Sequence, residues 1–366
     1  MRQPLLLALW REPQVGLEFS LAEWDLAIRQ ARSANVLASL DRRLAAHGLL
    51  DLVPARVKEH LLWIRGVAHQ HRQTIYREAA QICRALADLG DSVIFLKGAA
   101  YTLAELPVSQ GRLFSDIDVL VPEESLPAVE SALLRHGWAF SHLHPYDQHY
   151  YRMWMHELPP MRHVRRGTHL DVHHAIVPKT ARIRPDASKL CQAAQPVAGH
   201  ERAKVLAPED MVLHSAVHLF YEGEIDQGLR GLMDLDAMLI HFGDRPNFWE
   251  RLLARAMEMD LMRPLFYGIR YAQRILGTPI PAHIVISVES GAPPAVLQPL
   301  MDAIFHRVFL PNHASCCDRK TRLAAQALYL RGNWLRMPMP LLARHLSRKA
   351  WMSWKEQFIP STKPAV

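Results

Sequence analysis

The chain has 366 residues, of which 49% are hydrophobic and 22% are charged. These values lie in the range of globular proteins, and the length is enough for two or three packed units. The formal net charge of +7 favours anionic partners, such as nucleotides, nucleic acid or an acidic membrane surface.

The cysteines and the apolar segments bear on the compartment. The four cysteines form neither a CxxC pair nor a spacing typical of metal knuckles, so we expect reduced thiols. The apolar run in residues 1–10 is too short for a secretory signal, and Arg11 and Glu12 stand where a cleavage site would be needed. No stretch reaches the ~18 consecutive apolar residues of a membrane span. We therefore expect a soluble, cytoplasmic protein.

The first quarter of the chain has the pattern of helices. In residues 20–90 the apolar side chains recur at three- and four-residue spacing, and Gly90 is placed to end the last helix. The apolar run at 93–96 predicts a short buried strand, which a helix at 99–106 follows before Pro107.

The period then changes to that of a strand. Residues 113–121 alternate, with Asp116 and Asp118 on one face and apolar side chains on the other. An amphipathic helix is predicted at 123–136, with Leu134 among its inward residues.

The next segments complete the expected organisation. Residues 160–165 and 168–176 flank a turn like the arms of a hairpin. Helical periodicity returns from 209 onwards. We predict the following division: an N-terminal helical region at 1–71, a small α/β core at 72–180, a connector at 181–208, and a C-terminal helical domain at 209–366.

The paired aspartates predict a metal site. Two side chains at i and i+2 of a strand point the same way, with Cα atoms about 6 to 7 Å apart. Buried acids that face each other resist ionisation unless a cation compensates them. Oxygen ligands of this kind suit Mg²⁺, which completes its shell with water and substrate phosphates. The alternative is a solvated edge strand, the usual case for such a pair taken alone.

A third acid, Asp171, lies in a segment where Leu170 and Val172 face away from Asp171 and His173. A neighbouring strand could bring Asp171 beside the first pair. Three carboxylates with two metals would activate an attacking hydroxyl and stabilise a pyrophosphate leaving group. His173 would orient Asp171 or donate to a nucleotide.

Phosphate ligands are expected near the same strand. Lys97 and Gly98 lie at a strand-to-helix junction, where backbone N–H groups and the helix dipole can receive phosphate oxygens. Arg112, four residues before Asp116, offers a guanidinium clamp.

These motifs, in this order and spacing, resemble the uncharacterised nucleotidyltransferases of the DNA polymerase β-like superfamily. The resemblance extends roughly from Leu5 to Pro281. The segments that carry it are Phe95-Leu96-Lys97-Gly98, Gly111-Arg112, residues 115–121, Leu170-Asp171-Val172-His173, residues 206–210, His214, His218 and residues 229–234.

The resemblance implies an α+β fold, with a small polymerase-β-like core (a mixed sheet with flanking helices) between helical N- and C-terminal regions. It implies transfer of a nucleoside monophosphate from an NTP, with Mg²⁺ or alternatively Mn²⁺. Asp116, Asp118 and Asp171 would be the catalytic and metal-binding residues.

The nucleotide contacts follow from the same resemblance. They would come from Lys97, Gly98, Arg112, Ser115, His173 and Arg230. The family's usual Gly-Ser is here Gly98-Ala99, so a serine contact is missing and Lys97 would take its place.

Further polar residues allow other interpretations. His214 and His218, four apart on a helix, could hold a second metal with Asp234, although packing at a domain interface is the more common case for such residues. Arg230 could form a helix-surface ion pair with Asp234 or reach a substrate phosphate.

Two aromatic segments remain. The histidines and tyrosines of residues 142–151, with Trp154, predict an irregular segment that could contact substrate. The basic, tryptophan-containing residues 331–336 and 344–355 predict a packed helix with a solvated basic face, or peripheral contact with a membrane or RNA.

Three functions remain open at this point. The first is modification of a small molecule, peptide or protein. The second is a toxin-like enzyme acting on tRNA ends, which the charge of +7 permits. The third is a catalytically silent nucleotide-binding module. The acceptor, the preferred NTP and the oligomeric state are left open by the sequence.

Overall fold

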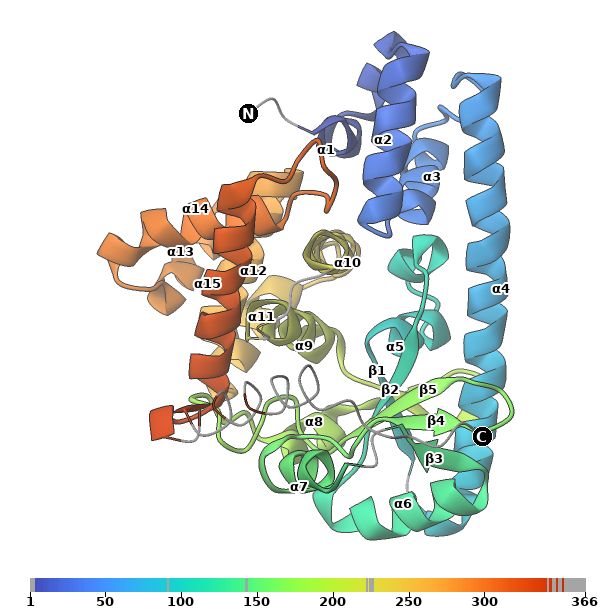
Figure 1. The fold of residues 1–366 in the computed structure, drawn as a ribbon, viewed down its shortest axis with the longest axis vertical. Coiled ribbons are helices and arrows are strands. Elements are labelled where there is room, and N and C mark those ends of the chain that lie inside the picture. The colour runs from blue at the N-terminus through green and yellow to red at the C-terminus, as the bar shows by residue number, and fades with distance from the viewer. Residues whose placement is uncertain are drawn as a thin grey trace.

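The protein is described by a computed structural model that covers residues 4–90, 92–141, 144–221, 223, 227–340, 342–343, 347 and 351. Its centre is one seven-stranded mixed sheet with the strand order β3-β4-β5-β2-β1-β7-β6. The strands are β1 (Val93–Leu96), β2 (Asp116–Leu120), β3 (Trp138–Phe140), β4 (Met161–His163), β5 (His169–His173), β6 (Gln195–Val197) and β7 (His200–Val205). Helices flank this sheet (Figure 1), which confirms the predicted fold class.

The middle of the sheet is formed by the predicted strands. β1 is buried along its whole length and pairs antiparallel with β2, while β2 pairs parallel with β5. The predicted hairpin is also confirmed, because β4 and β5 pair antiparallel around a turn in which Gly167 has a positive φ of 74°.

The predicted connector at 181–208 contains structure of its own. It holds α8 (Ala187–Ala193) and the strands β6 and β7, and β7 pairs parallel with β1. Only Ala203 and Val205 of β7 are buried. Two buried residues are too few to predict a strand here from the apolar pattern of the sequence. The sheet thus extends past the predicted core boundary, while the domain boundaries stay a prediction.

The N-terminal region is helical, as predicted, but its last helix runs past the predicted boundary at residue 71. Its helices are α1 (Leu5–Arg11), α2 (Leu21–Ser33), α3 (Leu37–Ala46) and α4 (Ala55–Ala85). The first apolar run of the chain forms α1, whose Leu6 and Leu9 are fully buried. α2 begins with a capping box between Ser20 and Glu23. The long helix α4 runs beside α2, α3 and the sheet (Figure 1).

Three more helices lie against the sheet or beside it: α5 (Lys97–Leu103), α6 (Leu126–Arg135) and α7 (Pro145–Trp154). Leu134 of α6 is 43% exposed, so its predicted inward position is wrong. The expectation of an irregular segment at 142–151 is also wrong for residues 145–151, which belong to α7. Proline is favoured in the first turn of a helix, whereas the many aromatic and histidine residues obscure the helical period.

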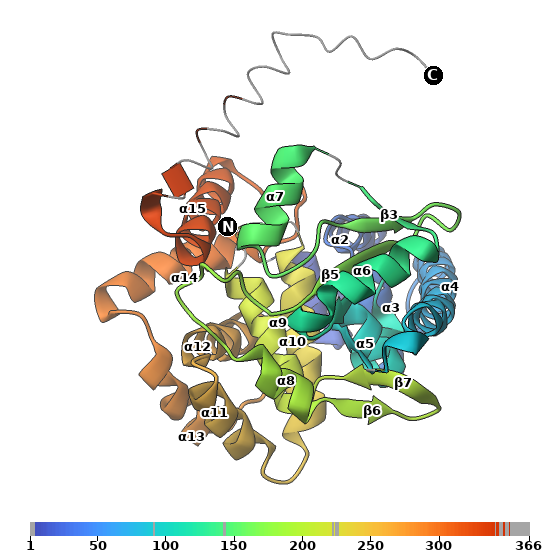
Figure 2. The same ribbon diagram turned by 90° about the horizontal axis from the view of Figure 1, so that it is seen from below.

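The C-terminal region is helical. Its helices are α9 (Pro208–Tyr221), α10 (Gly228–Gly243), α11 (Phe248–Glu258), α12 (Met262–Tyr271), α13 (Ala282–Ser287), α14 (Gln298–Val308) and α15 (Arg319–Arg336). α9 and α10 lie between the sheet and the outer helices α12 to α15 (Figures 1 and 2). Buried Asp236 of α10 accepts hydrogen bonds from Trp10 (3.3 Å) and Thr278 (2.6 Å). The bond from Trp10 connects this region to α1. Within the described residues, no helix is long and apolar enough to cross a membrane.

Candidate functional site

A cavity of about 500 Å³ lies between the sheet and helices α7, α9, α10 and α15. Polar and charged side chains dominate its wall. They include Lys97, Tyr101, Arg112, Asp116, Asp118, Tyr150, Tyr151, His156, Glu157, Asp171, His173, Ser215, His218, Arg230, Asp234, Tyr329, Asn333 and Arg336.

The strand register brings the three predicted aspartates together. β2 and β5 pair parallel with Asp118 directly opposite Asp171, and Asp116 lies two residues earlier on the same face of β2. One carboxylate oxygen from each residue lies within 4.8 Å of the others. Asp116 is exposed, whereas Asp118 is 3% exposed. The neighbouring strand that the sequence required for Asp171 is therefore present.

Asp118 is held by two hydrogen-bond donors. Lys97 Nζ donates to Asp118 Oδ1 at 2.8 Å, and His173 Nε2 lies 3.0 Å from the same oxygen. Burial raises the pKa of Asp118, but Lys97 and His173 outweigh it and hold this pKa well below its usual range. Lys97 itself has a positive φ of 45°, a conformation that costs a non-glycine residue of order 1 kcal/mol or more. The strand-to-helix junction thus aims the ammonium group at the carboxylate.

Asp171 has the opposite electrostatic environment. Burial, and then the charges of Asp118 and Glu157, raise the pKa of Asp171 to about 7. The cluster holds more negative charge than its own cations compensate. A divalent cation with oxygen ligands fits this donor set and would supply the missing positive charge.

Ser115 and His173 contact the aspartates, but the hydrogen bond of His173 goes to Asp118 and not to Asp171, the carboxylate that we expected it to orient. Ser115 Oγ donates to Asp116 Oδ1 at 2.8 Å. His173 contacts Asp118 and also faces Glu157, with 3.4 Å between Nδ1 and Oε2. Hydrogen bonding to Asp118 and the charge of Glu157 overcome the effect of burial and raise the pKa of His173. The predicted contacts of both residues with a nucleotide stay predictions.

Arg112 is fixed by an ion pair that the sequence did not reveal. Arg112 Nε lies 2.8 Å from Asp234 Oδ2, and both side chains are about nine-tenths buried. The interpretation of Asp234 as the helix-surface partner of Arg230 is therefore wrong, since Asp234 is 7% exposed. Arg230 is also near Asp234, because the two residues lie one turn apart on α10.

Gly98 makes room for Arg112. A Cβ atom at Gly98 would lie 1.8 Å from Arg112 Nη1 and 2.5 Å from Phe114 Cδ1. Gly98 is not part of the cavity wall, whereas Lys97 and Arg112 are. The glycine that the motif singled out thus has a packing role that places the guanidinium, and a direct phosphate contact stays a prediction.

Arg230 and Arg336 add to the positive side of the cavity. Arg230 comes from α10 and Arg336 is the last residue of α15. Burial and the nearby Arg112 lower the pKa of Arg230, which nevertheless leaves an arginine charged at neutral pH. Arg336 shows that the basic segment 331–336 packs against the core and reaches the cavity. Residues 344–346, 348–350 and 352–355 of the second basic segment lie outside the described residues.

The predicted alternative metal site at His214 and His218 finds no support in the geometry. His218 lines the cavity and His214 does not. Burial and the charge of Lys97 hold the pKa of His214 well below its usual range. Within the described part of the chain, the groups of three or more side chains close enough to share an ion do not include these two residues.

Several lining residues were missed or only partly anticipated. Tyr150 and Tyr151 of α7 reach the cavity, in line with the substrate contact expected for their segment. His156 and Glu157 follow α7, and no motif in the sequence marks them. Their proximity to His173 depends on an isolated antiparallel bridge between Glu157 and His173, the last residue of β5.

The comparison with known families agrees with this geometry. Residues 20–277 match the family described as uncharacterised nucleotidyltransferase, which is more than half of the 366 residues. No curated protein and no solved structure matches the chain. The matched region contains both the sheet with its aspartates and the helices α9 and α10 across the cavity. The chain belongs to the family of uncharacterised nucleotidyltransferases.

Proposed function

We propose that the protein transfers a nucleoside monophosphate from an NTP to an acceptor that is a small molecule, a peptide or a protein, and that the reaction depends on Mg²⁺. The observation that carries this proposal is the β2–β5 register, which places Asp118 opposite Asp171 with Asp116 beside them at one end of a polar cavity. The family assignment supports the transferase class.

The three carboxylates would hold the metal. Asp116 and Asp118 would share the metal, and Asp171 would be the third ligand. Mg²⁺ bound there would neutralise phosphate charge and lower the pKa of the attacking group. Lys97 holds Asp118 in its ionised form, so this ligand is ready at any pH near neutrality.

The chemical step is an in-line displacement at the α-phosphorus. The acceptor oxygen forms the new bond to phosphorus, the bond to the bridging oxygen of the β-phosphate breaks, and pyrophosphate leaves. Asp171 would accept the proton of the acceptor hydroxyl, because it lies opposite Asp118 and lines the cavity in which the acceptor would bind.

The positive side of the cavity would hold the triphosphate. Arg112, Arg230 and Arg336 line the same cavity as the aspartates. Guanidinium groups bind phosphate oxygens in a bidentate manner. Asp234 fixes Arg112 at 2.8 Å, so this arginine would be held in place before the nucleotide arrives.

The test is transfer of label from each of the four α-³²P-labelled NTPs in a cell lysate with Mg²⁺, using the purified full-length protein. We expect one NTP to label an acceptor, with Asp116→Asn giving no label above background. Asp116 is exposed, so this variant should keep its fold.

Asp244→Asn, on the exposed end of α10, is the matched control and should label normally. The identity of the labelled species decides the acceptor class, and label on tRNA would replace our acceptor assignment. Absence of label with all four nucleotides, in a protein that binds them, would contradict the proposal and favour a silent binding module.

A further inference from the structure

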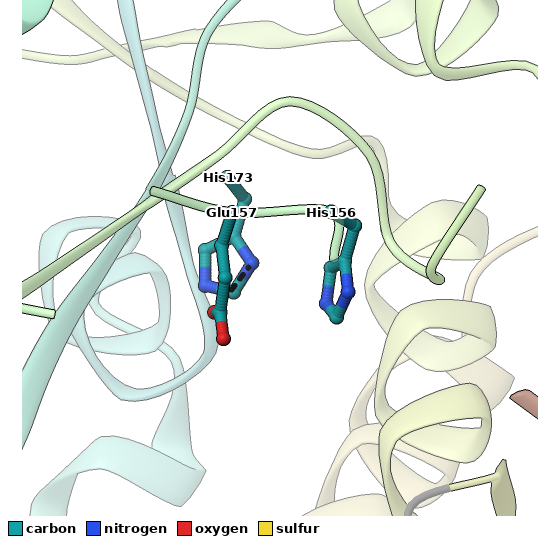
Figure 3. A group of neighbouring side chains, drawn as sticks. All are labelled: His156, Glu157 and His173. Carbon is teal, nitrogen blue, oxygen red and sulfur yellow. Dashed lines mark ion pairs between the residues drawn. The ribbon is translucent and has the colours of Figure 1, made fainter. Parts of the chain in front are cut away.

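A second group of side chains lies beside the three aspartates and has a different chemistry. His156, Glu157 and His173 each present a ligand atom within 4.8 Å of the other two. All three line the same cavity. Figure 3 shows that their side chains point to the same side of the backbone, with Glu157 next to the ring of His173.

The backbone holds this group together. Glu157 pairs with His173 in an antiparallel bridge, and directly paired residues carry their side chains on the same face. Leu158 N donates to Val172 O at 2.8 Å, and His174 N donates to His156 O at 2.9 Å. The segment after α7 is therefore attached to the C-terminal end of β5. The imidazole rings of His156 and His173 lie with their centroids 5.2 Å apart.

Asp118 fixes the tautomer of His173. The carboxylate only accepts hydrogen bonds, so His173 Nε2, 3.0 Å from Asp118 Oδ1, must carry the hydrogen. Nδ1 then faces Glu157, with its lone pair available to a metal whenever the ring is neutral. A carboxylate on one ring nitrogen and a metal on the other is the usual arrangement of metal-bound histidine.

The donor set separates this group from the aspartates. Two imidazoles with one carboxylate suit zinc-class ions, whereas three carboxylates suit Mg²⁺. Ligand atoms of tetrahedral zinc lie about 3.3 Å apart, because Zn–N and Zn–O bonds are about 2.0–2.2 Å. The separations of up to 4.8 Å require movements of about an ångström, which side-chain rotation of His156 and Glu157 can supply.

We propose that His156, Glu157 and His173 form a second metal site that binds a zinc-class transition-metal ion, with its remaining coordination positions open to the cavity. The site is linked to the three aspartates through the hydrogen bond between His173 and Asp118. It does not depend on the proposed nucleotidyl transfer, because the binding of the ion can be measured without turnover.

The experiment uses Co²⁺ as a spectroscopic probe on the full-length protein after treatment with a chelator. We expect visible d–d absorption that saturates at one equivalent of Co²⁺, persists in excess Mg²⁺ and disappears when Zn²⁺ is added. His156→Ala should abolish the band. Asp116→Asn and the exposed control His69→Ala should retain it.

Glu157→Gln keeps the size of the side chain and serves as a second variant if His156→Ala is unstable. We expect it to weaken Co²⁺ binding by about tenfold or more, the loss typical of changes around a metal site. An unchanged band in both variants, or no saturable band in the wild-type protein, would overturn the proposal. His173 would then serve only as a polar contact between Asp118 and Glu157.

Discussion

The two walls of the cavity are built in different ways. The carboxylate wall, which consists of Asp116, Asp118 and Asp171, is set by the pairing of two adjacent strands. The basic wall, which consists of Arg112, Arg230 and Arg336, comes from a loop and two helices that are far apart in the chain. Backbone pairing fixes the first wall, whereas tertiary packing fixes the second.

This difference implies that the walls respond differently to substitution. The exposed Asp116 can be altered without disturbing the strands, because the ladder between β2 and β5 uses backbone atoms only. Arg112 is held by the buried Asp234, so changing Arg112 alters packing as well as charge.

The largest effect is expected for the carboxylate wall. Asp116→Asn should lower the rate of NMP transfer by at least about a hundredfold, since a metal ligand at the reacting phosphate contributes several kcal/mol of transition-state stabilisation. Its melting temperature should stay close to that of the wild-type protein. Comparable activity of the two proteins in a single-turnover assay would show that Asp116 is not a ligand.

A substitution of Arg112 in the basic wall should lower the free energy of unfolding. Arg112→Ala leaves the Asp234 carboxylate buried without its partner, a defect that typically costs about 3 kcal/mol or more. The melting temperature should fall, and the double variant Arg112→Ala with Asp234→Asn should recover part of the loss. No recovery in the double variant would mean that the ion pair is not the cause.

Gly98→Ala tests the position of the Arg112 side chain without removing a charge. Alanine in a helix is normally about 1 kcal/mol more favourable than glycine, but here the new methyl group would meet Arg112 and Phe114. We expect a lower melting temperature and a weaker affinity for NTP. Gly66→Ala is the matched control, because Gly66 lies in α4 with open space around it, and it should stabilise the protein slightly.

Arg230→Gln should act mainly on nucleotide binding. Loss of one charge-assisted contact to phosphate is worth roughly 1.5 kcal/mol, or about tenfold in affinity. We expect KM for the NTP to rise by about that factor with a smaller change in kcat. Arg84→Gln, on the exposed face of α4, should leave both constants unchanged. A fall in kcat alone would assign Arg230 to another role.

Asp171 makes the stability of the protein depend on pH. Its pKa rises from an ordinary 3.8 to about 7 on folding, so between these values the folded protein binds more protons than the unfolded chain. Its contribution to stability is therefore present at low pH and is lost as pH rises through about 7. In EDTA, Asp171→Asn should melt above the wild-type protein at pH 8, with the difference shrinking toward pH 4. A constant difference across this range would contradict the assignment.

The sequence predicted those parts of the site that local patterns determine. Alternation in 113–121 and the hairpin at 160–176 predicted the strands that carry Asp118 and Asp171, and the structure supplies the pairing of these strands. The sequence did not reveal that β7 completes the sheet, because only Ala203 and Val205 of that strand are buried.

Contacts between distant segments were harder to anticipate. Asp234 lies one helical turn from Arg230, which predicted the wrong ion pair, and its actual partner Arg112 precedes β2. Glu157 and His156 belong to no motif, and they reach His173 only through an isolated bridge. Residues of this kind are brought together by tertiary packing, and a single sequence has no periodic signal for it.

The most direct test of the central claim is thermal stabilisation of the purified protein by non-hydrolysable NTP analogues, with and without Mg²⁺. If the two walls bind metal and triphosphate together, an analogue should raise the melting temperature in Mg²⁺ much more than in EDTA. Asp116→Asn should lose the Mg²⁺-dependent part, and Arg230→Gln should need more nucleotide for the same shift. Equal stabilisation in EDTA, or no shift with any of the four nucleotides, would contradict the account.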